Sequence, residues 1–157
     1  MYFPCPTTVH TIGPGMRIVV DTNVLLAILR SSIGASSAIL GLIDQRRVTP
    51  VVSVPLMFEY EEILHRPGLL SHLSAGEIDT FLNYFASVAA EQKIFFLWRP
   101  NLVDSDDDML LELAVAARAD YLVTHNVNDF LPFASDFGLK VVTPGEFLKA
   151  FRAGQPS

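Results

Sequence analysis

Acidic residues in this sequence stand at points where an apolar strand pattern gives way to a helix pattern. Asp21 directly follows the apolar run at 18–20, and a helical pattern begins at Asn23. A buried carboxylate is costly unless it is paired or binds a metal ion, so Asp21 either caps the next helix or belongs to a site. The other acids that follow a predicted strand or lie in the segment after it are Glu59, Glu61, Glu62, Asp104, Asp106, Asp107, Asp108 and Asp129.

Strand and helix patterns alternate regularly along the chain and must position these acids. We predict strands at 17–20, 49–53, 94–97, 121–124 and 140–143, and helices at 23–30, 35–46, 55–66, 74–90, 106–118 and 144–151. Ser53 is a predicted N-cap, and Ser74 and Glu77 have the spacing of a capping box. Short, almost wholly apolar strands that alternate with helices predict an α/β fold: a single-domain three-layer α/β/α sandwich around a parallel sheet of about five strands.

Parallel strands bring their carboxyl ends to one edge of a sheet, and ligands bind outside that edge. Asp21 directly follows the first predicted strand, and the second and fourth predicted strands end at Ser53 and Thr124, so the acids near these points should converge. Carboxylates that share a pocket repel one another unless a cation holds them together or they retain protons. Oxygen ligands suit Mg²⁺ or Mn²⁺, and two such ions roughly 3.5–4 Å apart can promote phosphodiester hydrolysis.

Each acid also has an ordinary structural interpretation. Asp21 fits an N-cap, and Glu61 and Glu62 fit solvated helix residues. The run 105–108 fits a capped helix start, and Asp129 fits an Asx-turn. Taken together, these interpretations leave the convergence at one edge unexplained.

Length and composition indicate the general class of protein. The chain has 157 residues, of which 50% are hydrophobic and 18% charged, and this predicts one globular domain at 16–151. We expect residues 1–15 to be a peripheral N-terminal extension, consistent with an upstream start codon before Met16, and 152–157 to be a tail. The single Cys5 excludes an internal disulfide and suits the cytoplasm. No stretch reaches the ~20 apolar residues of a membrane span, so no membrane partner is expected.

Charge and missing motifs narrow the function further. The net charge of −6 argues against a generic nucleic-acid binder with a basic face, although bound cations would reverse the sign locally. The GxxxxGK[ST], GxGxxG and GxSxG motifs are absent, and the four histidines lack metal-ligand spacing. A phosphoryl-accepting receiver domain would need an aspartate at the end of the third strand, and the predicted strand 94–97 is followed by Trp-Arg-Pro instead.

Four segments carry a resemblance to a known family. They are VVDTNVLL at 19–26, VVSVPLMFEYEEIL at 51–64, DSDDDMLLELAVAARADYLVTHNVNDF at 104–130, and a final strand and helix. In this order, residues 16–151 resemble the PIN domain, a metal-dependent nuclease fold found in many bacterial toxin–antitoxin toxins and RNA-processing enzymes. The resemblance implies a five-stranded parallel sheet and a homodimer or higher homo-oligomer.

The resemblance also implies a set of catalytic and metal-binding acids. Asp21 matches the family's first metal-binding aspartate, and Glu59 matches the glutamate of the middle helix. Asp108 matches the aspartate that opens the late helix, and Asp107 is its nearest rival. These acids would bind Mg²⁺ or Mn²⁺.

The remaining site residues follow from the last motif and the first. Asn23 matches the polar residue that braces the first aspartate, and Thr124 matches the site threonine at a strand end. Asn126 stands where some members carry the fourth aspartate, whereas others carry it later, which fits Asp129. We therefore assign Asp129 as the fourth acid, with Asn23, Thr124 and Asn126 in support.

The acids and the resemblance leave two functions open. The first is a Mg²⁺- or Mn²⁺-dependent endoribonuclease that hydrolyses RNA, acting as the toxin of a toxin–antitoxin pair with a small antitoxin protein as partner. The second is a catalytically inactive PIN-fold module that binds RNA or a protein partner. Metal-dependent cleavage of RNA distinguishes them.

Overall fold

The computed structural model describes residues 15–94 and 105–154, with the backbone alone for 105–107. Its elements, in chain order, are β1 (Met16–Val20), α2 (Thr22–Arg30), α3 (Ala35–Asp44), β2 (Val48–Val52), α4 (Val54–Leu64), α5 (Ala75–Val88), β3 (Ala90–Glu91), α6 (Ser105–Ala116), β4 (Tyr121–Val123), the 3₁₀ helix η1 (Val127–Asp129), α7 (Leu131–Ala134), the 3₁₀ helix η2 (Ser135–Phe137), β5 (Lys140–Val142) and α8 (Pro144–Ala153).

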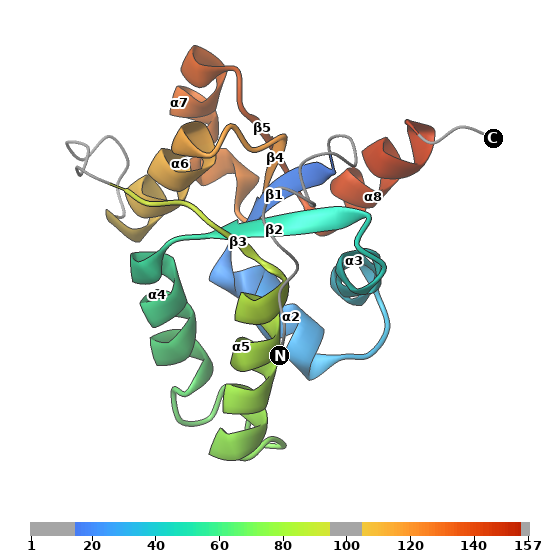
Figure 1. Ribbon diagram of the computed structural model, residues 1–157, viewed down its shortest axis with the longest axis vertical. Coiled ribbons are helices and arrows are strands. Elements are labelled where there is room, and N and C mark those ends of the chain that lie inside the picture. The colour runs from blue at the N-terminus through green and yellow to red at the C-terminus, as the bar shows by residue number, and fades with distance from the viewer. Residues whose placement is uncertain (1–14, 95–104, 155–157) are drawn as a thin grey trace.

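The five strands form one parallel sheet in the order β3-β2-β1-β4-β5. Helices cover both sides of it: α2, α3, α4 and α5 lie on one side of β2, and α6 and α7 lie on the other (Figure 1). The predicted α/β fold with a five-stranded parallel sheet is therefore confirmed. The strands are apolar at nearly every position because a sheet covered on both faces buries both sets of side chains. Ile18, Val19, Val51 and Leu122, for example, are fully buried.

The direction of chain travel reverses beside β1. From β1 the chain moves outward to β2 and β3, and it then returns to add β4 and β5 on the other side of β1. The carboxyl ends of β1 and β4 therefore lie next to each other at a topological switch point, the place where open α/β sheets bind ligands. The first residues beyond these two strands are Asp21 and Thr124.

The third strand differs from its predicted position. The prediction placed it at 94–97, but β3 is Ala90–Glu91, which pairs with Val51 and Val52 of β2. Residues 95–97 lie outside the described residues, and Ile94 is not in a strand. The helical pattern of α5 runs on through the alanines at 89 and 90, since alanine favours a helix. Pairing with the edge of β2 ends the helix at Val88 instead, and no local signal marks that point.

Local capping signals, in contrast, predicted helix starts well. The Ser53 hydroxyl accepts a hydrogen bond from the N–H of Leu56 at 3.2 Å and begins α4. Ser74 and Glu77 form the predicted capping box at the start of α5. Both interactions span three residues, so they depend little on the rest of the fold.

Among the described residues, no single helix has the length and apolar composition to cross a membrane, although α2 and α3, bent by 96° at their junction, meet these criteria as a pair. The predicted N-terminal extension at 1–15 lies outside the described residues except for Gly15, and so do residues 155–157 of the predicted tail at 152–157. The first two residues of that tail belong to α8.

Candidate active site

Asp21 and Thr124 meet where β1 and β4 end. The ladder pairs Val20 with Val123, and the N–H of Asp21 continues it by donating to the carbonyl of Val123 at 2.9 Å. The two side chains that follow the strands are thereby held opposite each other. The Thr124 hydroxyl donates to Asp21 Oδ2 at 2.7 Å. A contact between residues 103 positions apart thus fixes the carboxylate at the switch point.

Asp21 occupies the N-cap position of α2 without acting as a cap. Its side chain forms no capping hydrogen bond to the helix. The carboxylate instead binds Thr124 and, at a longer 3.4 Å, the side-chain amide of Asn23. This arrangement disfavours the interpretation of Asp21 as only a helix cap.

Asn23 and Thr124 also organise the loop that follows β4. The Oδ1 atom of Asn23 accepts the N–H of His125 at 3.3 Å, and the Thr124 oxygen accepts the N–H of Asn126 at 3.0 Å. Asn23 therefore contacts Asp21 with its amide nitrogen and the loop backbone with its amide oxygen, whereas Thr124 makes both contacts with its hydroxyl. Their hydrogen bonds therefore link the Asp21 carboxylate to the backbone of this loop.

Burial raises the pKa of Asp21 above its ordinary value of 3.8. Removing a carboxylate from water disfavours its charged form. The hydrogen bond from Thr124, the nearby N–H groups of Thr22 and Asn23, and the charge of His125 act in the opposite direction. In the described residues, no lysine or arginine forms an ion pair with Asp21. The site therefore holds a carboxylate that has lost solvation and that forms no ion pair with a described lysine or arginine.

Tyr60 connects the middle helix to the same strand end. Its hydroxyl donates to the carbonyl of Val20 at 2.5 Å, and its side chain is fully buried. The pKa of this hydroxyl lies well above its ordinary value because of burial, and the charges of Asp21 and Glu59 raise it further. Both carboxylates therefore lie within electrostatic range of one phenol. Glu59 is half-buried, next to Tyr60 on α4.

Asp108 lies in the first turn of α6, the helix that packs against β1 and β4. Helix α6 leads into β4, which is parallel to β1. A helix that precedes a parallel strand begins toward the carboxyl edge of the sheet, which is the edge where Asp21 follows β1. The Asp108 side chain is 8% exposed. The rival Asp107 is outside the described side chains.

The fourth predicted acid lies in a different environment. Asp129 ends the short helix η1 and is exposed, and so is Asn126. The N–H of Asp129 donates to the carbonyl of Asn126 at 3.1 Å, which folds this loop back on itself. Glu61 and Glu62 are exposed, as predicted for solvated helix residues, and Glu62 pairs with Arg66 at 3.2 Å.

Comparison with known proteins identifies the family. The family model described as PIN domain matches residues 17–128, which is most of the chain. The chain belongs to the PIN domain family. No curated protein matches it. Among solved structures, it is similar to a chain in the crystal structure of VapBC2 from Rickettsia felis bound to a DNA fragment from their promoter, with a TM-score of 0.58 and 16% identity over 82% of this chain and 98% of that chain.

The comparisons agree with the described fold and with membership of the PIN domain family. The VapBC2 chain shares the α/β arrangement, and at this identity it shows the fold alone. PIN domains are generally nucleases, and they typically use divalent metal ions. The question is therefore whether this PIN domain retains the residues for that chemistry.

The donor chemistry of the acids near this edge suits a hard divalent cation. Among the side chains described, at 15–94 and 108–154, no three histidine, cysteine, aspartate or glutamate residues lie close enough together to hold a metal ion. Two features fit a divalent cation: the candidate ligands offer only oxygen atoms, and the Asp21 carboxylate at the switch point is desolvated. A metal site in this PIN domain therefore rests on the acids near the carboxyl edge of the sheet, and its ligand set is a proposal.

Two residues near this edge were not predicted as site residues. Tyr60 lies in the predicted helix at 55–66, and its hydroxyl bond to Val20 had no signal in the sequence. Glu112 lies four residues after Asp108, which places both on the same face of α6. It is 4% exposed. A glutamate in the apolar run MLLELAVA is unusual in itself, and that signal could have marked it.

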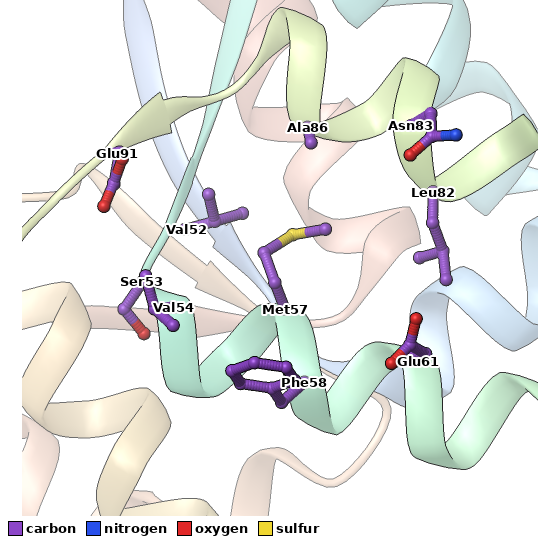
Figure 2. Close-up of a pocket in the computed structure, with 10 residues that line it drawn as sticks. All are labelled: Val52, Ser53, Val54, Met57, Phe58, Glu61, Leu82, Asn83, Ala86 and Glu91. Atoms are coloured by element: carbon purple, nitrogen blue, oxygen red, sulfur yellow. The ribbon is translucent and has the colours of Figure 1, made fainter. Parts of the chain in front are cut away.

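A separate apolar groove of about 290 Å³ lies between α4 and α5. Met57 of α4 and Leu82 of α5 point toward each other across it, and Glu61 lies on its α4 side (Figure 2). Two large apolar side chains that line it are strongly exposed, Phe58 at 66% and Val54 at 54%. Clustered exposed apolar side chains are typical of surfaces that contact other proteins.

Proposed function

We propose that this protein is a Mg²⁺- or Mn²⁺-dependent endoribonuclease that acts as the toxin of a toxin–antitoxin pair. The observation that carries the proposal is the desolvated carboxylate of Asp21, held by Thr124 and Asn23 at the topological switch point of a PIN domain. A structural N-cap would have no need of this bracing across 103 residues.

The proposal assigns roles to the acids at this edge. Asp21, Glu59 and Asp108 would hold the cation, and Asp129 would complete the site. When bound, the cation would supply the Lewis acidity that activates water and neutralises charge on the phosphate. Asn23 and Thr124 orient the Asp21 carboxylate, and such bracing of a ligand typically matters 10–100-fold in metal affinity or activity.

The antitoxin partner is proposed from a fold neighbour and an exposed surface. The similar solved structure is that of VapBC2 bound to a DNA fragment from their promoter, and exposed Phe58 and Val54 offer this chain a surface for a protein. A short reading frame beside this gene that encodes a DNA-binding protein, whose product blocks RNA cleavage when co-expressed, would support the toxin role. Cleavage unaffected by any such product would contradict it.

The test of the nuclease uses a mixed RNA pool with EDTA, Mg²⁺ or Mn²⁺. We expect cleavage with either metal and none in EDTA. Asp21→Asn keeps the shape of the side chain and should abolish cleavage. Asp44→Asn, at an exposed position at the end of α3, is the matched control and should cleave like the wild type. If Asp21→Asn cuts as fast as the wild type, the assignment is wrong.

A second function has its own supporting observation. Within the described part of the chain, no three acids are grouped to hold a metal ion, as a catalytically inactive PIN module that binds RNA or protein would allow. Such a module would bind the RNA pool and leave it intact in all three buffers.

A further inference from the structure

A groove between α3 and α8 lies beside the candidate active site. The two helices pack against each other (Figure 1). A pocket of about 270 Å³ opens where both helices begin, and its lining includes Gly34, Ser36, His125, Thr143 and Gly145. His125 follows Thr124 directly, and its charge acts on Asp21. The pocket is therefore next to the acidic edge, on the side of the α3 and α8 N-termini.

The start of α3 presents free backbone donors to this pocket. Its N-cap, Gly34, has no side chain to cap the helix, and the first N–H bonded within the helix is that of Ala38. The N–H groups of Ala35, Ser36 and Ser37 have no partner among the described residues. Such groups, with the helix dipole behind them, favour an anion.

The start of α8 adds one more donor. Thr143 and Glu146 form a capping box, which satisfies the N–H groups of both residues and occupies the Glu146 carboxylate. Pro144 has no N–H to offer. The N–H of Gly145 is left without a partner in the described chain, and Gly145 lines the pocket.

A serine that is more than nine-tenths buried and lines the pocket provides an independent sign of a ligand. Ser36 is 7% exposed and lines the pocket, yet its hydroxyl forms no hydrogen bond with any described residue. Buried polar side chains are nearly always hydrogen-bonded. Ser36 therefore has the capacity to bind a group that enters this pocket.

The groove continues into a basic region. A second hollow of about 490 Å³ shares Gly34, Ala35 and Gly145 with the first and adds the exposed Lys149 and Arg152 of α8. In neither hollow does a described aspartate or glutamate contribute to the lining. For a chain with a net charge of −6, an acid-free groove with two basic residues is a marked local reversal.

We propose that the α3–α8 groove binds phosphate groups of the RNA backbone that flank the bond to be cut. The pocket at the helix N-termini would take one phosphate through the Ser36 hydroxyl and free N–H groups, and Lys149 and Arg152 would attract the next. This inference rests on the proposed nuclease function. It explains how an acidic protein binds a polyanion: cations occupy the acidic edge, and the groove beside it is already positive.

The first test uses inorganic phosphate and the full chain in EDTA. Phosphate should shift the amide NMR signals of Ala35, Ser36, Ser37 and Gly145. Gly145→Glu places a carboxylate at the pocket, where a side chain meets no atom within 4 Å and an acid suits the helix start. It should weaken phosphate binding about fivefold or more, as a like charge about 4 Å away does in water. Gly145→Gln, of the same size without charge, should keep most of the binding.

The second test uses a fluorescent single-stranded RNA in EDTA, where nothing is cut. Lys149→Gln should weaken binding and lower the slope of log affinity against log salt by about 0.7. Lys93→Gln removes the same charge from an exposed position outside the groove and should leave the slope unchanged.

The outcomes separate this inference from the nuclease proposal. If phosphate shifts the signals of the four amides in the wild type, and Gly145→Glu abolishes these shifts, the phosphate-binding groove is supported even in a protein that never cuts RNA. Phosphate shifts elsewhere or none at all, or an equal effect of Lys149→Gln and Lys93→Gln on RNA binding, would overturn it even if cleavage is metal-dependent. Asp21→Asn should still bind RNA in EDTA.

Discussion

Replacing Tyr60 with phenylalanine tests whether the middle helix holds the end of β1 in place. The substitution deletes one hydroxyl, which donates to the Val20 carbonyl at 2.5 Å, and it keeps the ring in its edge-on contact with Phe85 at 5.7 Å. A typical hydrogen bond contributes about 0.5–1.5 kcal/mol, and a buried acceptor left unpaired costs about 1–3 kcal/mol. Since Tyr60 is fully buried, we expect the free energy of unfolding to fall by about 1–2 kcal/mol.

Urea unfolding measures this change directly, and a thermal melt should show Tm lower by about 3–6 °C for a chain of this size. Val20 immediately precedes Asp21, so a looser strand end should also misplace the carboxylate. RNA cleavage with Mn²⁺ should therefore drop several-fold, while RNA binding in EDTA stays at the wild-type level.

Tyr84→Phe is the matched control. Tyr84 lies half-buried on α5, and its hydroxyl forms no hydrogen bond with the described residues. The same atom is deleted, and the free energy of unfolding should change by less than about 0.5 kcal/mol. If Tyr60→Phe is no less stable than Tyr84→Phe, the hydroxyl does not anchor β1 and the reasoning is refuted.

Two further predictions concern the site and its helix. Burial raises the pKa of Asp21 in the folded protein, so its contribution to stability is full below pH 3.8 and is lost as the pH rises through the raised pKa. In metal-free urea melts, Asp21→Asn should not show this loss and should be the more stable protein at pH 7. Equal stability of the two proteins at pH 7 would contradict the direction of the pKa shift. Ser53→Ala removes the cap of α4, the helix that carries Glu59 and Tyr60, and should lower the free energy of unfolding by about 1 kcal/mol in the same assay, with no change if the cap is dispensable.

Helix starts and strand interiors could be predicted because their signals are local. The caps at Ser53 and Ser74 depend on a hydroxyl and an N–H three residues later, and the apolar runs of β1 and β2 follow from burial on both faces. The position of β3 could not be predicted in this way. A two-residue strand has almost no pattern of its own, and its pairing with Val51 and Val52 depends on where α5 ends.

The candidate site divides along the same line. The ends of the predicted strands placed Asp21 and Thr124 at one edge, and the family resemblance added Asn23; the structure joins these three residues by hydrogen bonds. The roles of Glu59, Asp108 and Asp129 as metal ligands stay predictions. The burial of Glu112, the hydroxyl bond of Tyr60 and the groove between α3 and α8 arise from contacts between distant segments, which no window of the sequence contains.

By itself, the sequence determined the class of the fold, the family resemblance and the chemistry that its acids could perform, because side-chain type, period and capping act over a few residues. Only the tertiary structure decided that β4 returns beside β1 and so sets Thr124 against Asp21. Strand order depends on how the sheet and its two helix layers pack together, and the solvation of a carboxylate depends on how far the residues of those layers bury it.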